Sequence, residues 1–296
     1  MKIENFKLKI VFFGTPSFVI PVLDALQKNF NLVGVVTTPD TIQGRKKILT
    51  PTPIKQHCLD QKLSIPVITP EQLTDQTMKQ LQELSPDLFI TAAYGKFLPE
   101  EILSIPKLGS LNIHPSLLPK YRGASPIQTA ILNGDTETGV TIIKMDDQLD
   151  HGPILIQKTM QLHGKETFES LHTELFQVAA ELLPTTIEGW KNGTLKAVPQ
   201  DESQAVLCKK ITKEDGYFSI ERPPKPEVLD RMIRAYYPWP TAYTKLPLKH
   251  AEVKIVKFLP ERRIQVEGGK PMGLKEFLNG YPELQTTMQK LLGSSD

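Results

Sequence analysis

The sequence has few cysteines and no long apolar run. Cys58 and Cys208 are the only two thiols among its 296 residues. Two thiols so far apart in the chain cannot build a disulfide framework or a zinc site, so we expect both to be reduced. No stretch approaches the roughly 20 apolar residues that a membrane helix needs, and residues 1–10 lack the apolar centre of a signal peptide. We therefore expect a cytoplasmic protein that does not enter a membrane.

An excess of charge of one sign is also absent. The sequence carries 35 lysines and arginines against 33 aspartates and glutamates, a net charge of +2. A nucleic-acid partner would therefore have to be bound by a local basic cluster rather than by the charge of the whole chain. The hydrophobic fraction of 40% is ordinary for a globular protein, and the length suffices for one large domain and a smaller one.

Short apolar runs alternate with helical patterns in the first half of the chain. Apolar residues recur with helical spacing over residues 19–26, and residues 69–72 have the pattern of a capping box that opens a helix. The repeated strand–helix–strand order predicts an α/β fold with a doubly wound, mostly parallel sheet. Four apolar runs predict its buried strands: residues 9–13, 32–37, 88–92 and 111–113.

The second half predicts one long helix and then a change of texture. An apolar stripe predicts a helix over residues 167–190, which Gly193 ends. Residues 195–204 are polar and irregular, and the short apolar runs at 253–258 and 264–266 indicate a small β-rich domain. We predict three parts: a catalytic domain over residues 1–194, a linker over 195–207 and a C-terminal domain over 208–296.

Asn112 and His114 stand two residues apart at the end of a predicted strand. Alternate side chains of a strand share a face, and open α/β sheets bind ligands at the carboxyl ends of their strands. A carboxamide can stabilise an oxyanion and an imidazole can move a proton near neutral pH, which suits acyl transfer. Ser116 lies beside prolines rather than in a nucleophile elbow, so direct attack by a substrate amine is favoured over an acyl-enzyme. Hydrogen bonding within a turn is the alternative role for the pair.

Three acids, Asp146, Asp147 and Asp150, follow the apolar run at residues 140–143. They are candidates for proton handling, and a solvated acidic turn or a cation site would show the same pattern. The histidines are scattered without the paired spacing of metal ligands, so the sequence predicts no metal.

Together, these segments resemble the folate-dependent formyltransferase family. The resemblance rests on Asn112-x-His114, residues 116–119, Arg122-Gly123 and Leu149-Asp150-x-Gly152, in the order and spacing of that family. It implies that Asn112, His114 and Asp150 form the catalytic trio and that 10-formyltetrahydrofolate is the formyl donor. It also implies that a set of residues contacts the folate: Phe97, Leu98, Ser116, Leu117, Leu118, Pro119, Met145, Asp147 and Leu149.

Within that family, the sequence resembles the branch that formylates methionine on initiator tRNA. Gly44-Arg45-Lys46-Lys47 resembles the basic loop with which those enzymes engage the acceptor end of the tRNA, and residues 210–216 and 234–240 resemble the entry to their C-terminal domain. Lysine and arginine on a glycine-flanked loop can reach phosphates or unpaired bases. The implied partner is initiator methionyl-tRNA, bound by a monomer through Arg45, Lys46, Lys47 and Lys210.

The sequence also departs from that branch. The C-terminal domain of the branch is usually an OB-like barrel, which needs five strands to approach closure. Here the apolar runs at 253–258 and 264–266 follow each other almost at once, so we expect a shortened, open sheet. Pro115 and Pro153 are familiar from the branch that formylates glycinamide ribonucleotide. Formylation of that nucleotide, or of a nucleotide-linked amino sugar, is therefore the alternative activity, and a tRNA- or folate-binding protein without catalysis is the alternative of another class.

Overall fold

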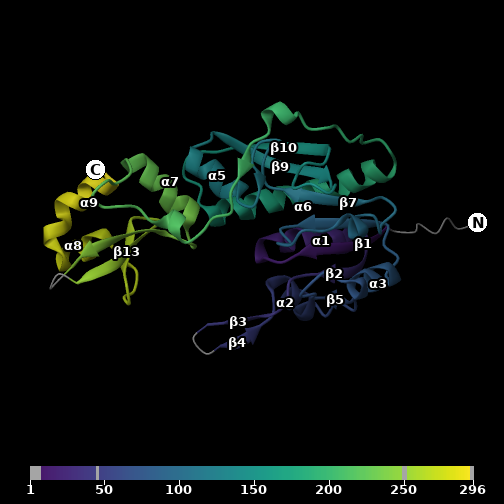
Figure 1. Ribbon diagram of the computed structural model, residues 1–296, viewed down its shortest axis with the longest axis horizontal. Coiled ribbons are helices and arrows are strands. Elements are labelled where there is room, and N and C mark those ends of the chain that lie inside the picture. The colour runs from purple at the N-terminus through teal and green to yellow at the C-terminus, as the bar shows by residue number, and fades with distance from the viewer. Residues whose placement is uncertain (1–7, 45–46, 249–251, 294–296) are drawn as a thin grey trace, which may run out of the picture. The chain divides into compact units, whose positions relative to one another are not determined.

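The computed structural model describes residues 8–44, 47–248 and 252–293 of the chain, which forms two compact units. Figure 1 labels the elements of both. The division predicted after residues 194 and 207 stays a prediction. No helix in the described ranges is long and apolar enough to cross a membrane. The first unit contains Met1–Arg122, Gly139–Thr159 and Thr173–Leu207, and the second contains Gly123–Thr138, Met160–His172 and Cys208–Asp296.

Seven strands form one sheet in the order β10-β9-β7-β6-β1-β2-β5. The neighbours from β7 to β5 run parallel, and β9 runs antiparallel to β7. The α/β fold with a mostly parallel sheet is therefore confirmed, and the four predicted strands are present with ends within one residue of the prediction. The strands are β1 (Lys9–Gly14), β2 (Asn31–Val36), β5 (Val67–Ile68), β6 (Leu88–Ala92), β7 (Ser110–His114), β9 (Glu137–Lys144) and β10 (Ile154–Gln161).

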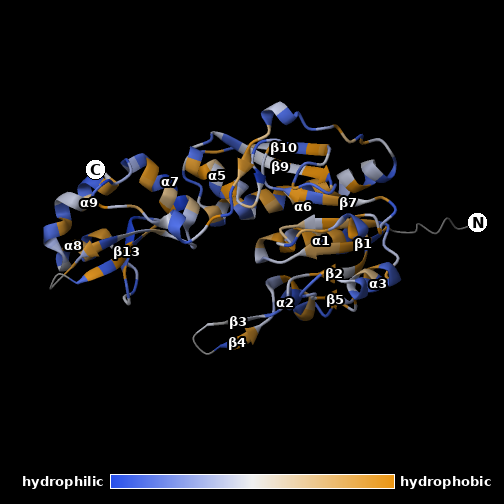
Figure 2. Cartoon of the chain, viewed as in Figure 1, coloured by the Kyte–Doolittle hydropathy of each residue, from blue (hydrophilic) through white to orange (hydrophobic). Residues whose placement is uncertain are grey.

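Apolar side chains are buried on both faces of this sheet. Val11 and Phe13 of β1 pack on one face in a cluster with Leu81 of α3 and Ile102 of α4. Ile10 and Phe12 alternate with them, so they point to the opposite face, and they are also fully buried. Figure 2 accordingly shows β1 as hydrophobic over most of its length. The helices around the sheet are α1 (Ile20–Asn29), α2 (Pro53–Asp60), α3 (Asp75–Glu83), α4 (Glu100–Leu103) and α6 (Phe168–Lys191), with short 3-10 helices η1 (Ser17–Val19) and η2 (Glu202–Gln204).

One helix start was predicted wrongly. Residues 69–72 do not open a helix, because α3 begins only at Asp75, where Thr74 and Thr77 form the capping box. The carbonyl oxygens of Pro70 and Glu71 each accept a hydrogen bond from Lys96 Nζ at 2.6 Å. A distant lysine thus binds the backbone that a helix would have used, and a local pattern cannot reveal such a partner.

The second unit is built around the antiparallel sheet β12-β13-β14-β15. Val256 and Phe258 of β13 and Ile264 of β14 point into a core that includes Leu229 of α7 and Phe277 of α8. The expected small β-rich domain is confirmed, and within residues 208–248 and 252–293 its sheet has four strands against the five of an OB barrel. The elements are α5 (Pro126–Asn133), η3 (Glu214–Gly216), α7 (Pro226–Tyr236), β12 (Ala242–Pro247), β13 (Val253–Leu259), β14 (Arg263–Val266), β15 (Met272–Gly273), α8 (Leu274–Gly280), η5 (Pro282–Leu284) and α9 (Gln285–Leu292).

Two further pairs of strands are short. β3 (Thr41–Gln43) and β4 (Ile48–Thr50) form an antiparallel hairpin, which stands away from the sheet of its own unit in Figure 1. β8 (Arg122–Gly123) pairs with β11 (Leu207–Cys208), which brings the start of the C-terminal segment back to the residues that follow β7.

Candidate active site

Asn112, His114 and Asp150 converge at one point of the first unit. Asn112 and His114 lie on the same face of β7, and Asp150 lies in the loop between β9 and β10. Asp150 Oδ1 is 3.2 Å from Asn112 Nδ2, which donates a hydrogen bond to it, and 3.4 Å from His114 Nδ1. The side chains of His114 and Asp150 are only 5% and 11% exposed. One carboxylate oxygen therefore faces both an amide and an imidazole in a largely buried site.

The hydrogen bond of His114 Nε2 determines which ring nitrogen carries the hydrogen in a neutral imidazole. Nε2 lies 2.9 Å from the carbonyl oxygen of Tyr121, which can only accept, so Nε2 carries a hydrogen. A neutral His114 would then turn the lone pair of Nδ1 toward Asp150 Oδ1, and two acceptors at this distance repel each other. A proton between Nδ1 and Oδ1 removes the repulsion. The pair is thus built to hold one mobile proton.

The loop of Asp150 depends on a glycine. Asp150 has a φ of 51°, in the left-handed region, and the chain then turns back so that Pro153 accepts a hydrogen bond from the Lys144 amide at 3.0 Å. A Cβ at Gly152 would lie 1.8 Å from the Lys144 carbonyl oxygen. The turn that aims Asp150 at His114 therefore requires glycine two residues later, which is the physical reason for the Asp150-x-Gly152 pattern.

A buried polar network holds this loop from the other side. Gln200 Nε2 donates to the carbonyl oxygens of Asp150, His151 and Gly152 at 2.9, 2.9 and 2.8 Å. Gln200 Oε1 accepts from Arg122 Nε at 3.0 Å, and Arg122 also donates to both carboxylate oxygens of Glu202. The hydrogen bonds between Arg122 and Glu202 raise the pKa of Arg122 and lower that of Glu202. Sequence reasoning missed Gln200, because it lies in a segment predicted to be a linker and no local pattern distinguishes it there from Gln204.

A cavity lies at the amino end of β7, the strand that carries Asn112 and His114. It has a volume of about 560 Å³, and its walls include Leu103, Ser110, Met145, Asp146 and Asp147. Ser110 is the first residue of β7, and its side chain shares a face of the strand with that of Asn112, two residues later. The trio itself does not line this cavity, which lies at the opposite end of the strand from His114.

The residues predicted to contact folate fall into three groups by their surroundings in the structure. Met145 and Asp147 line the cavity, and Leu98 is buried in the core cluster against which Met145 packs. Phe97 and Leu149 are each 61% exposed. The segment that holds Ser116, Leu117, Leu118 and Pro119 does not line this cavity but is tied to β9 and β10, because Thr141 Oγ1 donates to the Ser116 carbonyl at 2.6 Å and Gln157 Nε2 to the Leu118 carbonyl at 2.7 Å.

The predicted RNA-binding residues lie on the surface where the structure describes them. Lys47 is exposed beside β4, and Arg45 and Lys46 lie outside the described residues. Ile48 and Leu49 of the same hairpin are 59% and 63% exposed, which is unusual for large apolar side chains. Lys210, just after β11 in the second unit, is exposed as well.

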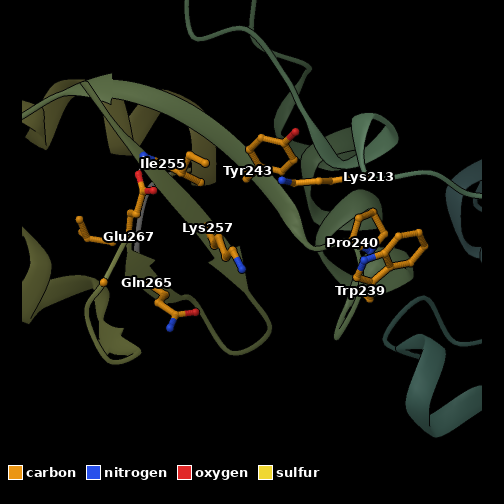
Figure 3. A pocket seen from close by; sticks show the side chains of 10 residues that line it. Lys213, Trp239, Pro240, Tyr243, Ile255, Lys257, Gln265 and Glu267 are labelled. Carbon is orange, nitrogen blue, oxygen red and sulfur yellow. Dashed lines mark hydrogen bonds between the residues drawn. The ribbon is translucent and has the colours of Figure 1, made fainter. Parts of the chain in front are cut away.

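The second unit has a cavity of its own, of about 340 Å³, on the face of its sheet turned away from the core (Figure 3). Tyr243, Lys257 and Gln265 form a row across β12, β13 and β14, because Tyr243 pairs with Lys257 and Lys257 with Gln265. Lys213 and Trp239 also line it, and the Trp239 side chain is 56% exposed. The exposed Trp239 ring thus lines the same cavity as Lys213 and Lys257, whereas Tyr243 is buried.

Known proteins with similar sequences and structures identify the family. A family model described as formyl transferase matches residues 8–187. A methionyl-tRNA formyltransferase of Roseiflexus sp. (strain RS-1) is 43% identical over 255 residues, 84% of this chain and 77% of that relative. The chain belongs to the methionyl-tRNA formyltransferase family. The relative of the same name from Staphylococcus aureus (strain JH1) is 39% identical over 88% of this chain and 83% of its own length.

The solved structures agree on the fold of this family member. An N-formyltransferase of Helicobacter canadensis, in complex with folinic acid and dTDP-3-aminofucose, has a TM-score of 0.61 at 18% identity, covering 90% of this chain and 98% of that chain. At this identity the likeness shows the fold alone. No group of three or more His, Cys, Asp or Glu side chains able to hold a metal ion occurs among the residues that the structure describes.

Proposed function

We propose that this chain transfers the formyl group of 10-formyltetrahydrofolate to the α-amino group of methionine on initiator tRNA. Membership of the family and the names of its relatives support the reaction and the acceptor. The observation that carries the chemistry is the convergence of Asn112, His114 and Asp150 at the carboxyl end of β7.

The folate would bind in the cavity of the first unit. Its wall combines apolar residues such as Leu103 and Met145 with the polar residues Asp146 and Asp147. A pterin ring is flat and carries donors and acceptors along its edge, so it suits an apolar slot with a few convergent polar groups. In this position the formyl group of the donor would extend along β7 from Ser110 toward Asn112 and His114.

The three side chains divide the work of acyl transfer. The methionine amine attacks the formyl carbon, a C–N bond forms, and the carbonyl oxygen becomes an oxyanion. Asn112 Nδ2 has two hydrogens, of which one binds Asp150 and the other is left for the oxyanion. The proton that the attacking nitrogen loses passes through the pair of His114 and Asp150 to the nitrogen of the departing tetrahydrofolate, and the bond to that nitrogen breaks. Removal of one oxyanion donor costs on the order of 10²–10³ in turnover.

The tRNA would contact two surfaces, one in each unit. The hairpin of β3 and β4 offers Lys47 with exposed Ile48 and Leu49, and the adjoining residues Arg45 and Lys46 are proposed on the sequence alone. In the second unit, the surface of Lys213, Trp239 and Lys257 has the groups that bind unpaired nucleotides, since ammonium groups attract phosphates and aromatic rings stack on bases. Lys210 would add a phosphate contact. We also propose that the chain works as a monomer in the cytoplasm.

Acceptor competition tests this function. The purified chain is supplied with 10-formyltetrahydrofolate and one of three acceptors: initiator methionyl-tRNA, a nucleotide-linked amino sugar, or glycinamide ribonucleotide. Consumption of the formyl donor with methionyl-tRNA alone supports the proposal, and turnover with either of the other two instead overturns it. Binding of folate and tRNA without turnover would identify a binding protein.

Variants then test the trio on the acceptor that is consumed. Asn112→Ala and His114→Ala should each lower kcat by on the order of 10² or more. Asn192→Ala and His163→Ala remove the same side chains from exposed positions and should leave kcat unchanged. Near-normal turnover of Asn112→Ala or His114→Ala would refute the assignment of the chemistry to this site.

A further inference from the structure

Gln200 fastens the loop that carries Asp150. Its amide nitrogen is within 2.9 Å of three consecutive carbonyl oxygens, those of Asp150, His151 and Gly152. An amide has only two hydrogens, so the three oxygens share them, and at least one bond is three-centred. Three carbonyl dipoles that point at one place repel each other unless a donor stands between them. The Gln200 amide is that donor.

The orientation of this amide is itself fixed. Arg122 Nε and one of its terminal nitrogens donate to Gln200 Oε1 at 3.0 and 2.8 Å, so the oxygen must face Arg122 and the nitrogen must face the loop. Arg122 is 6% exposed and Gln200 9%. Glu202 accepts from the other side of the guanidinium at 2.9 and 2.6 Å. The chain Glu202–Arg122–Gln200 thus ends on the backbone of the loop that carries Asp150.

The loop needs such an anchor. Asp150 holds a left-handed φ of 51°, which non-glycine residues adopt only where the surroundings enforce it. Asp150 Oδ1 must at the same time stay within reach of both Asn112 and His114. A small rotation of the loop backbone would move the carboxylate away from one of them.

We propose that Gln200 is a positioning residue of this enzyme, through which Arg122 fixes the Asp150 carboxylate toward His114 and Asn112. The proposal rests on the proposed function, because it assigns to Gln200 an effect on the same reaction. It predicts that loss of the Gln200 amide lowers kcat and leaves the KM of both substrates unchanged, since neither the folate cavity nor the proposed RNA surfaces contain Gln200.

The fold around Gln200 does not depend on its side chain alone. Two residues earlier, Val198 and Ile154 exchange two backbone hydrogen bonds of 2.8 Å, which fasten the segment to β10. Gln200→Leu therefore removes the amide while the segment stays in place. Gln200→Glu keeps the size and the bond to Arg122 but offers the three carbonyls no donor, so it decides the question if Gln200→Leu fails to fold.

The experiment measures kcat and KM of the full chain with the acceptor that it consumes. We expect Gln200→Leu and Gln200→Glu to lower kcat by on the order of 10²-fold, the cost of a misplacement of about 1 Å. Gln204→Leu, an exposed amide in the same segment, should match the wild type. Because Gln200 acts through Asp150, Gln200→Leu should lower kcat no further in an Asp150→Ala background.

Three results would overturn the proposal. They are wild-type kcat in both Gln200 variants, a rise in KM with kcat unchanged, and a loss that multiplies with that of Asp150→Ala. Failure of the proposed function is a separate outcome, visible in the wild type as turnover of a different acceptor. The kcat ratios of the variants would then be measured on that acceptor.

Discussion

A single methyl group at Gly152 should inactivate the enzyme without unfolding it. The Cβ of an alanine at this position would lie 1.8 Å from the Lys144 carbonyl oxygen and 3.0 Å from its carbon. Both contacts are with backbone, so no side chain can rotate to relieve them. The backbone φ of Gly152 is not in the left-handed region, so the effect of Gly152→Ala comes from this contact rather than from a forbidden conformation.

The size of the required movement follows from the geometry. Real Cβ atoms essentially never approach a heavy atom closer than 3.0 Å, so the loop must open by at least 3.0 − 1.8 = 1.2 Å. Asp150 is two residues away on the same short loop and moves with it. A misplacement of about 1 Å at a catalytic group can cost on the order of 10²-fold in rate. We therefore expect kcat of Gly152→Ala to fall by about 10²-fold or more, with a smaller change in the KM of either substrate.

The assay is steady-state formyl transfer, with the thermal midpoint of unfolding measured on the same preparation. Gly273→Ala is the matched control, because a Cβ at Gly273 meets no atom within 4 Å and its φ of −72° suits alanine. The control should keep both kcat and the thermal midpoint. A folded Gly152→Ala variant with near wild-type kcat would show that the position of Asp150 does not limit the reaction.

Three further predictions concern the RNA surfaces and pH. Replacing Arg45, Lys46 and Lys47 together with alanine should raise the KM for methionyl-tRNA and make that KM less dependent on salt concentration. The reason is that each lost phosphate contact lowers the slope of log K against log salt by roughly 0.7–0.9. An unchanged slope would exclude the hairpin from RNA binding. Trp239→Ala should weaken tRNA binding by about 1–3 kcal/mol in a filter-binding assay if a base stacks on this ring, with folate binding unaffected; equal tRNA binding would refute the stacking. The Arg122 hydrogen bond lowers the pKa of Glu202 below its usual 4.5. The Glu202 carboxylate therefore stabilises the fold above that pH, and this stabilisation is lost as pH falls through the lowered pKa. The difference in thermal stability between wild type and Glu202→Gln should thus vanish in acid. A difference that persists in thermal unfolding at acid pH would contradict the cause assigned to the shift.

Local patterns were sufficient for the elements of the sheet. Buried strands such as β6 are continuous apolar runs, and the stripe of α6 repeats at helical spacing, so burial alone marks them in the sequence. The same reasoning placed a helix start at residues 69–72, where Lys96 binds the backbone carbonyls instead. Lys96 follows this segment only after α3 and β6, so no local pattern could reveal the contact.

The candidate site shows the same boundary between sequence and structure. The spacing of Asn112 and His114 on a strand determined that they share a face, since the strand period is two, and the Asp150-x-Gly152 pattern recorded a turn that only glycine permits. The tertiary structure alone decided that Asp150 Oδ1 reaches both of them and that Gln200 holds the loop. It also decided which predicted folate residues line a cavity, namely Met145 and Asp147, and which are exposed, namely Phe97 and Leu149. These contacts join residues that are far apart in the chain, and their hydrogen bonds depend on distance and direction in space, which the order of the residues does not encode locally.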